Sequence, residues 1–359
     1  MEKRSKIYVA GHRGLVGSSL CRRLSADGYT QVITRTHSEL DLTVQKAVHE
    51  FFADEKPEYV FLAAARVGGI HANSTYRGDF ILNNLLIQTN VIHAAYKYGV
   101  KKLLFLGSSC IYPRECPQPM KEKDLLTSEL EYTNEPYAIA KIAGLKLCES
   151  LSLQYGCNFI SVMPTNLYGP ADNYSLKDSH VLPALIRKLH LSKLASGNSA
   201  ENKKKILSDL SISSWDEAQV ALEENGITSD GITLWGSGNA KREFLYSDDL
   251  AEACVYIMNT IDFSERVRAV KKINHHEIRN THINIGSGCE HTIKELAEMI
   301  ADIVGYRGRI FFDHTKPDGT PRKFLDSNEL TATGWTPKIS IKEGLSRAYA
   351  DYLHTHTGS

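Results

Sequence analysis

A glycine-rich turn near the N-terminus constrains the fold of this 359-residue chain more than any other feature. Gly11–Gly17 reads GHRGLVG, follows the apolar run Ile7–Ala10 and opens a helical pattern that continues to Leu24. Glycines permit a tight turn and close approach of the backbone, and a helix N-terminus supplies unpaired amides for a pyrophosphate. We interpret this segment as a dinucleotide-binding turn between a strand and a helix; an ordinary glycine-rich turn is the alternative.

The rest of the sequence places this turn in an alternating pattern of strands and helices. Short apolar runs rich in β-branched and aromatic residues alternate with helical patterns, which is typical of a parallel sheet covered by helices. The predicted strands are Ile7–Ala10, Gln31–Thr34, Tyr59–Ala64, Lys102–Leu106 and Asn158–Met163, and the clearest helices are Asn83–Tyr98 and Ala138–Tyr155. Further elements are predicted at Ile232–Trp235, Ser247–Met258, Ile293–Val304 and Arg309–Phe312. We predict an α/β fold: a Rossmann-type doubly wound parallel sheet with a smaller α/β substrate-binding part.

The domain boundaries follow from this grouping. The Rossmann domain is predicted at 1–175, completed by about 238–262, and the substrate-binding domain at 176–237 and 263–359. Residues 192–231 are polar with few large apolar side chains, so we interpret them as a surface insertion. Within it Ser214 and Glu217 form a capping-box signal, Ala218–Glu224 favours one short helix, and Asn225-Gly226 favours its end. A plain surface loop, a lid and a contact to a second subunit all remain open for this insertion.

Composition narrows the class of partner. The chain has 42 basic and 42 acidic side chains, so its net charge gives no reason to expect a nucleic acid or a membrane surface as partner. No apolar run approaches the roughly 20 residues of a membrane helix, and the charged N-terminus leaves no room for a secretory signal. Seven cysteines without zinc-site spacing favour a reducing compartment and no metal site. We therefore expect a soluble, cytoplasmic protein.

The end of the second predicted strand distinguishes the two nicotinamide cofactors. An enzyme that prefers NAD usually presents an acidic side chain to the ribose 2′-hydroxyl here. This sequence instead places Arg35 and His37 there, and Arg13 lies within the glycine turn. Basic side chains suit the 2′-phosphate of NADP, so we predict NADP; solvated surface charge is the alternative for each residue.

Three further residues have the chemistry of a carbonyl reductase. Tyr137 and Lys141 are four residues apart at the start of a predicted helix, hence on one face, and the ammonium is expected to lower the pKa of the phenol. Ser108 follows the fourth predicted strand, at the sheet edge where ligands of such folds bind. The three residues predict reduction of a carbonyl by a nicotinamide cofactor, whereas the tyrosine and lysine alone would indicate only an exposed helix face.

Several longer motifs make the chain resemble a known family. They are Ala10–Gly17 (AGHRGLVG), Leu62–Ile70 (LAAARVGGI), Phe105–Pro113 (FLGSSCIYP), Asn134–Lys141 (NEPYAIAK), Val162–Pro170 (VMPTNLYGP) and Lys316–Arg322 (KPDGTPR). With these motifs the chain resembles the extended short-chain dehydrogenase/reductase superfamily and, within it, the GDP-L-fucose synthases. The resemblance spans nearly everything except the insertion.

The resemblance implies a two-part reaction. GDP-4-keto-6-deoxy-D-mannose would be inverted at C3 and C5 and then reduced at C4 by NADPH to GDP-L-fucose. Because the 4-keto group acidifies both neighbouring carbons, Ser108 and Tyr137 would stabilise enolates before they assist hydride transfer. The family assigns the epimerising base and acid to a cysteine and a histidine, which match Cys110 and His180. If the chain stays extended, Cys110 and Ser108 leave the same side of the backbone.

The resemblance also implies the binding residues and the assembly. Cofactor contacts are expected from Gly11, His12, Arg13, Gly14, Leu15, Val16, Gly17, Arg35, His37, Asp41, Leu42, Phe105, Leu106, Gly107, Ser108, Lys141, Pro164, Thr165, Asn166 and Leu167. Substrate contacts are expected from His180, Lys188, Trp235, Arg242 and Asp318. Of these, Lys188 and Arg242 suit a pyrophosphate, Trp235 offers an aromatic face, and Asp318 is an acceptor for sugar hydroxyls. By the same resemblance, the protein is expected to form a homodimer joined by a helix bundle, to which Asn83–Tyr98 and Ala138–Tyr155 would contribute.

Two departures and two alternatives accompany this interpretation. His37 stands where an arginine is expected near the 2′-phosphate, and the insertion is longer than the family pattern. One alternative is a 4-epimerase or 4,6-dehydratase of the same superfamily; Cys110 argues against it, since a dehydratase is expected to carry an Asp-Glu pair after the active-site serine region. The other is a non-catalytic NADP-sensing protein, which the intact Ser108, Tyr137 and Lys141 disfavour.

Overall fold

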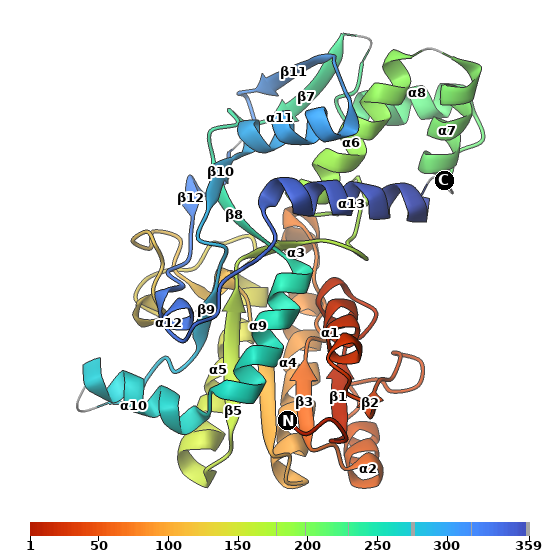
Figure 1. The fold of residues 1–359 in the computed structure, drawn as a ribbon. Helices are drawn as coiled ribbons and strands as arrows, with labels where there is room; N and C mark the ends of the chain where they lie inside the picture. Colours follow the sequence, from red (N-terminus) through yellow and green to blue (C-terminus); the bar gives the residue numbers. More distant parts are fainter. Residues whose placement is uncertain (177, 198, 229, 274–276, 317, 357–359) are drawn as a thin grey trace. The chain divides into compact units, whose positions relative to one another are not determined.

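The computed structural model describes residues 1–176, 178–197, 199–228, 230–273, 277–316 and 318–356. The chain divides into two compact units, each built from several segments (Figure 1). Unit 1 consists of Met1–Leu167, Phe244–Gly288 and Phe324–Lys338, and unit 2 consists of Tyr168–Glu243, Cys289–Lys323 and Ile339–Ser359. These bounds differ from the sequence-based ones, because 263–288 and 324–338 group with the glycine turn rather than with the second unit.

A six-stranded parallel sheet forms the centre of unit 1. Its strands are β1 (Ile7–Ala10), β2 (Val32–Ile33), β3 (Tyr59–Leu62), β4 (Lys102–Leu106), β5 (Phe159–Pro164) and β9 (Ile283–Ile285), in the order β2-β1-β3-β4-β5-β9. All neighbouring pairs are parallel. The five predicted strands are confirmed with small shifts at their ends. Strand β9 was not predicted; its pairing with β5 explains why 263–288 belongs to unit 1.

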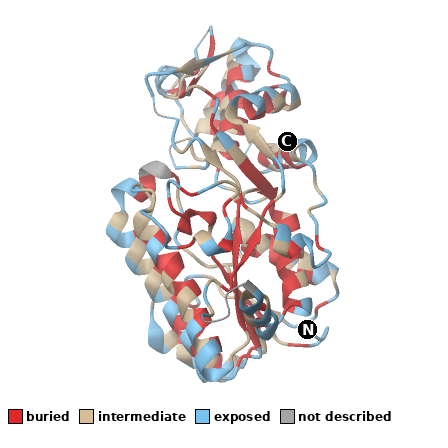
Figure 2. Cartoon of the chain, turned by 90° about the vertical axis from the view of Figure 1, so that its left-hand side faces the viewer, coloured by how far each residue is buried: buried red, intermediate tan, exposed pale blue. Residues whose placement is uncertain are grey.

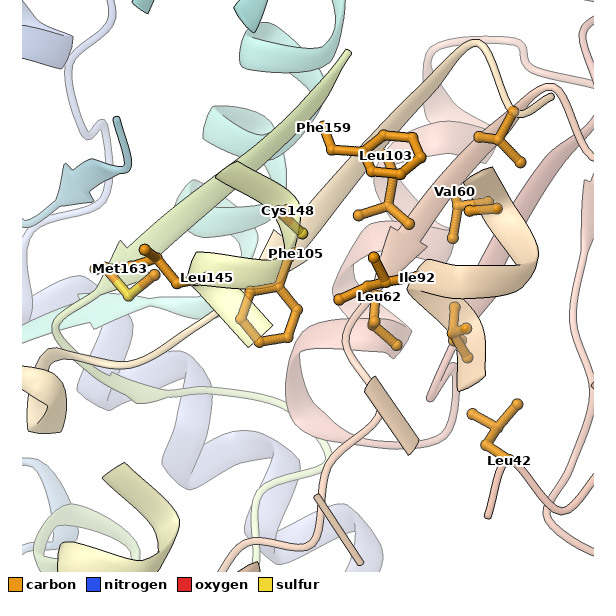
Figure 3. Packing of buried hydrophobic residues seen from close by; sticks show 14 of the residues in the cluster. Leu42, Val60, Leu62, Ile92, Leu103, Phe105, Leu145, Cys148, Phe159 and Met163 are labelled. Carbon is orange, nitrogen blue, oxygen red and sulfur yellow. The ribbon is translucent and has the colours of Figure 1, made fainter. Parts of the chain in front are cut away.

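Helices cover both faces of this sheet, which confirms the doubly wound architecture. Helices α1 (Leu15–Ala26) and α9 (Ser247–Thr260) contribute to one buried cluster with Val9, Phe61 and Ile283. Helices α2 (Gln45–Glu55), α4 (Arg77–Lys97) and α5 (Glu135–Tyr155) contribute to the cluster on the other face. There Phe105 and Leu62 of the strands lie among Ile92 and Leu145 of the helices (Figure 3). In Figure 2 the buried residues accordingly concentrate in the strands and along one side of each helix.

The strand order places a topological switch point between β1 and β3. From β1 the chain crosses to β2 on one side, and β3 then pairs with the other side of β1. Ligands of open parallel sheets bind beyond the carboxyl ends of the strands at such a point. The glycine turn directly follows β1, so the sheet itself positions it at this location.

Unit 1 also contains shorter elements. They are α3 (Ile70–Thr75), the 3₁₀ turns η1 (Ser109–Ile111) and η2 (Glu122–Asp124), α10 (Phe263–Ile273) and α12 (Asn328–Thr331). Two predicted helices of this unit extend further than expected: α4 begins at Arg77 and α5 at Glu135. Helix α5 ends at Tyr155, as the sequence predicted, and the left-handed Gly156 is its C-cap. Among the described residues, no helix is both long and apolar enough to cross a membrane.

In its described residues, unit 2 combines two small sheets with five helices. Its strands are β7 (Gly231–Trp235) paired with β11 (Arg309–Asp313), and β10 (Glu290–Thr292) and β12 (Arg322–Lys323) paired with the start of β8 (Lys241–Tyr246); β6 (Asn166–Tyr168) lies at the boundary. Its helices are α6 (Val181–Ser196), α7 (Ala200–Leu210), α8 (Trp215–Glu224), α11 (Ile293–Val304) and α13 (Ile341–His356). The predicted α8 is confirmed, and the Ser214 Oγ caps it by accepting from the Glu217 amide at 3.5 Å.

The predicted surface insertion is more ordered than expected. Besides α8, it contains the end of α6 and all of α7, which the sequence did not predict. Helix α7 presents Ile206 and Asp209 to the interior, and both residues are buried. The polar composition of 192–231 therefore reflects the outer face of a helical segment and not a loop.

Candidate active site

The glycine turn has a geometry that only glycine allows at two of its positions. Gly11 has a φ of +86°, and a Cβ there would meet the Ala64 backbone nitrogen at 2.7 Å. A Cβ on Gly17 would lie 2.0 Å from the Gly11 carbonyl oxygen. The turn from β1 thus passes against the backbone that follows β3, and α1 packs directly on the turn. This is the close backbone packing that a dinucleotide-binding turn requires.

Two polar features of the turn fit an anionic cofactor. Gly14 is the N-cap of α1 and provides no side-chain cap, so the first amides of the helix lack the usual side-chain partner there. His12 Nδ1 is a buried atom with no hydrogen-bond partner among the described residues. Residues 11–17 therefore suit the pyrophosphate of NADP, and a bound cofactor would supply hydride chemistry at the carboxyl edge of the sheet.

The basic residues expected near the 2′-phosphate differ in their availability. Arg13 is exposed in the turn, and the His37 ring is 83% exposed, with Nδ1 3.8 Å from Asp41 Oδ1. Arg35 is already engaged, because it donates to Glu55 Oε1 at 2.6 Å and to the Thr34 carbonyl at 2.8 Å, and stacks over Phe51. Of the three, Arg13 and His37 are the groups that remain open to a phosphate.

Sequence reasoning missed Glu39 in this region. Its carboxylate accepts from the Thr36 amide at 2.7 Å and from the Thr36 hydroxyl at 2.8 Å. These hydrogen bonds lower the pKa of Glu39, and the guanidinium groups of Arg35 and Arg13 act in the same direction. The acid thus lies within electrostatic reach of both arginines, a relation that its position two residues after His37 did not reveal.

The remaining expected cofactor residues lie at the ends of strands of unit 1. Phe105 and Leu106 end β4, and a Cβ on Gly107 would lie 2.2 Å from Met163 Sδ. Pro164 ends β5, and Thr165, Asn166 and Leu167 follow it, with the Thr165 amide donating to the Ile285 carbonyl at 2.9 Å. Leu42 is different: its side chain belongs to the hydrophobic core and its carbonyl accepts from Asn90. A contact between Leu42 and a cofactor would therefore have to involve atoms other than its buried side chain and its carbonyl oxygen.

The three reductase residues lie in unit 1, on β4, its following turn and α5. Lys141 is almost fully buried, and its Nζ donates to the Leu106 carbonyl at 2.7 Å and lies 5.7 Å from the Tyr137 ring centroid. Burial lowers the pKa of Lys141 to about 8. Burial also raises the pKa of Tyr137, and the negative charge of Cys110 acts in the same direction.

Tyr137 therefore differs from the sequence-based expectation, because burial raises its pKa although Lys141 lies nearby. Burial also disfavours the charged form of Lys141 itself. At neutral pH Tyr137 retains its proton. That protonation state suits a group that donates a proton or a hydrogen bond to a carbonyl oxygen.

Cys110 lies in a 3₁₀ turn and not in the extended segment that the alternation argument assumed. The Ser108 Oγ caps this turn by accepting from the Cys110 amide at 3.3 Å. The Cys110 side chain is largely buried, and its charge acts on both Tyr137 and Lys141. A short helical turn, rather than strand alternation, thus brings the thiol into the same electrostatic site as the reductase residues.

The expected substrate residues lie in unit 2 and form two groups. His180 is the N-cap residue of α6 and Lys188 lies two turns further along the same helix. Partial desolvation lowers the pKa of His180 although the residue remains exposed, and the Lys323 ammonium acts in the same direction. Desolvation also lowers the pKa of Lys188.

The second group surrounds the end of β7. Trp235 is 70% exposed, with the Lys316 ammonium 5.6 Å from its ring centroid. Asp318 accepts from the Ser237 amide at 2.6 Å and from the Ser237 hydroxyl at 2.8 Å. A Cβ on Gly319 would lie 3.5 Å from Arg242 Nη2, so the guanidinium and the acidic loop are adjacent. The structure thus brings Trp235, Arg242 and Asp318 together, and adds Ser237 and Lys316, which sequence reasoning missed.

Comparisons with known proteins agree with this geometry. Residues 7–286 match the model of the NAD dependent epimerase/dehydratase family. The chain is 53% identical to a putative GDP-L-fucose synthase 2 of Arabidopsis thaliana, over 98% of this chain and 93% of the relative. It is 46% identical to the GDP-L-fucose synthase of Escherichia coli K12, over 98% of this chain and 97% of the relative.

A solved structure extends the comparison to the whole chain. A GDP-6-OMe-4-keto-L-xylo-heptose reductase from C. jejuni superposes with a TM-score of 0.93 and is 43% identical, with 99% of both chains covered. The two chains therefore share their fold over nearly their whole length.

Proposed function

Because the chain belongs to the NAD-dependent epimerase/dehydratase family, we propose that it is a bifunctional 3,5-epimerase and NADPH-dependent 4-reductase. Its product is GDP-L-fucose, as the names of its relatives suggest, and its substrate is GDP-4-keto-6-deoxy-D-mannose, as the family resemblance implies. The observation that carries this proposal is the turn at Ser108–Cys110. It places a thiol close enough to Tyr137 and Lys141 to influence their pKa values. Reduction alone does not require a thiol at this place.

The residues divide the reaction between them. The 4-keto group acidifies the hydrogens at C3 and C5, and the Cys110 thiolate removes each proton in turn. Hydrogen bonds from Ser108 and Tyr137 to O4 stabilise the enolate, and His180 returns a proton to the opposite face of the ring. The glycine turn at residues 11–17 would hold NADPH, which would supply the hydride for reduction at C4. Tyr137 gives its proton to O4, and Lys141 stabilises the resulting phenolate.

The test is NADPH oxidation in the presence of GDP-4-keto-6-deoxy-D-mannose. We expect stoichiometric loss of NADPH absorbance, and product identification as GDP-L-fucose by nuclear magnetic resonance. A product with one or both centres uninverted removes the epimerase assignment. Conversion without net NADPH loss supports the alternative 4-epimerase or 4,6-dehydratase of the same superfamily.

A GDP-heptose 4-keto reductase is the second candidate. It is suggested by the solved reductase of this description, which is 43% identical and superposes with a TM-score of 0.93. The two candidates differ in the chain at C6 of the sugar. Comparing kcat/KM for GDP-4-keto-6-deoxy-D-mannose with that for a GDP-4-keto-heptose distinguishes them, and a clear preference for the heptose replaces the first proposal.

Arg13 is proposed as the main determinant of NADP preference. Arg13→Ala is expected to raise the KM for NADPH about tenfold and to leave the KM for NADH nearly unchanged, because only NADPH carries the phosphate. Arg35→Ala is the matched control and should have a smaller effect, since Arg35 is already paired with Glu55. Equal changes in both KM values for Arg13→Ala would mean that Arg13 holds a part of the cofactor common to both.

We also infer a homodimer formed through α4 and α5, which pack against each other. Leu82 and Leu86 on α4 and Ile139 and Leu153 on α5 are exposed apolar side chains one to several turns apart. A second copy of the same two helices would complete a four-helix bundle and cover them. Leu86→Glu is expected to halve the mass measured by light scattering, whereas Val220→Glu on exposed α8 should not. An unchanged mass for Leu86→Glu contradicts this interface.

The cysteines support a cytoplasmic location. None of the seven, all within the described part of the chain, forms a disulfide, and Cys289 is exposed. Exposed thiols persist in reducing compartments. Fractionation of the host cell tests the location directly.

A further inference from the structure

A buried polar cluster lies directly behind the turn that carries Cys110. Tyr112 follows this turn, and its side chain is 3% exposed. The Tyr112 hydroxyl donates to Asn284 Oδ1 at 2.6 Å and lies 2.9 Å from His282 Nε2. His282 and Asn284, just before and within β9, are fully buried. Cys110, Tyr112, His282 and Asn284 all belong to unit 1.

The protons of this cluster have one consistent arrangement. Tyr112 has a single hydroxyl hydrogen, which it donates to Asn284, so His282 Nε2 must donate to the Tyr112 oxygen. Burial lowers the pKa of His282 to about 3, and Lys146 and Arg266 act in the same direction, so the ring is neutral with one N–H. His282 Nδ1 is buried and has no hydrogen-bond partner among the described residues, as expected if the hydrogen is on Nε2.

The cluster is anchored to the sheet on its other side. The Asn284 side-chain amide donates to the Met120 carbonyl at 3.1 Å and to the Asp326 carbonyl at 3.2 Å. The Asn284 backbone amide donates to Glu122 Oε1 at 3.0 Å. Strand β9 is itself hydrogen-bonded to β5. The Tyr112 hydroxyl is therefore held by a fixed part of the fold.

By contrast, the turn holds itself only weakly. Its internal hydrogen bonds are long: the Cys110 amide lies 3.3 Å from Ser108 Oγ, the Ile111 amide 3.3 Å from the Ser108 carbonyl, and the Tyr112 amide 3.5 Å from the Ser109 carbonyl. Such distances are at the weak end of the hydrogen-bond range. The hydrogen bond from the Tyr112 hydroxyl to Asn284, two residues further along the chain from Cys110, is shorter than these three at 2.6 Å.

We propose that Tyr112 is a positioning residue that fixes the Cys110 thiol for proton transfer through its hydrogen bonds to His282 and Asn284. The inference rests on the proposed epimerase function of Cys110. Ser108 is joined directly to the end of β4, so it depends less on this anchor than Cys110 does. Tyr112 should therefore support proton exchange at C3 and C5 more than it supports hydride transfer.

Tyr112→Phe tests this division of roles, because it removes only the hydroxyl. We expect solvent-deuterium exchange at C3 and C5 to fall about tenfold or more, since small misplacements of a reacting group have large effects on rate. Hydride transfer from GDP-L-fucose to NADP⁺, which needs no epimerisation, should stay within about twofold of wild type, and the KM for the GDP-sugar should not change. The matched control is Tyr29→Phe, which removes another largely buried hydroxyl, bonded to Asn259, from unit 1.

A second pair of variants approaches the same hydrogen bond from the other side. His282→Gln keeps an N–H donor and should retain most of the exchange rate, whereas His282→Met should lose exchange as Tyr112→Phe does. Parental exchange in Tyr112→Phe, or an equal loss of exchange and hydride transfer, overturns the inference. Wild-type enzyme that reduces substrate without any exchange instead overturns the proposed epimerase function.

Discussion

Replacing Cys110 with serine is expected to lower the rate of solvent-deuterium exchange at C3 and C5 of the bound sugar by about 10²–10³-fold, because a hydroxyl is a far poorer base than a thiolate near neutral pH. Serine is close in size, and the anchor of this turn through Tyr112 to His282 and Asn284 stays intact in this variant. The change should therefore leave the fold and the reductase residues in place. Exchange is measured by mass spectrometry of the recovered nucleotide sugar in D₂O.

The reverse hydride transfer separates this prediction from a general loss of activity. Oxidation of GDP-L-fucose by NADP⁺ depends on Ser108, Tyr137 and Lys141 and should fall by no more than a few-fold in Cys110→Ser. Cys289→Ser, at an exposed cysteine of unit 2, is the matched control and should change neither rate. Parental exchange in Cys110→Ser would show that another group is the base, while the reductase assignment would stand.

The central sheet could be predicted because its local signals agree with its tertiary environment. β1 and β4 have the predicted bounds, since apolar runs buried on both faces of a parallel sheet need no partner information to be recognised. β9 was not predicted, because its three residues, Ile283, Asn284 and Ile285, include a polar side chain whose partners, Tyr112, Met120 and Asp326, lie far away in the sequence. Pairing with β5 makes it a strand, and nothing within its own sequence indicates that contact.

For the candidate site, the sequence indicates residues but not their energetics. The order of the glycine turn, Ser108, Tyr137 and Lys141 along the chain is visible in the sequence, and the structure brings the last three together in unit 1. The direction of the Tyr137 pKa was wrong, because spacing reports the nearby lysine but not the burial of both groups. Likewise the partner of Arg35 is Glu55, twenty residues away, which no local pattern indicates.

The polar segment 192–231 shows the same limit most clearly. Asp209 of α7 has a fully buried carboxylate, to which Arg187 of α6 donates at 2.8 Å and Tyr352 of α13 donates through its hydroxyl. Arg187 also donates to the Asp209 carbonyl at 2.7 Å. A charged residue in a polar stretch suggests a surface, yet here it joins three helices from distant parts of the sequence. The burial of Asp209 is thus determined by its partners and not by its amino-acid type.

Asp209→Ala is therefore expected to destabilise unit 2 by about 3 kcal/mol, because removing one partner leaves the Arg187 guanidinium and the Tyr352 hydroxyl without their acceptor. Urea unfolding followed by the fluorescence of Trp215, on the adjoining helix α8, measures the change. If the uncompensated charge is the cause, the double variant R187M/D209L should recover a large part of the loss.

Glu201 on the same helix offers the matched control. It pairs with Lys205 at 2.8 Å, but both side chains are exposed and screened by water, so Glu201→Ala should change the stability very little. A loss for Asp209→Ala no larger than this would mean that α7 is not held by the buried ion pair. The expected contrast between two acidic residues eight positions apart follows from one being buried against α6 and α13 and the other facing water.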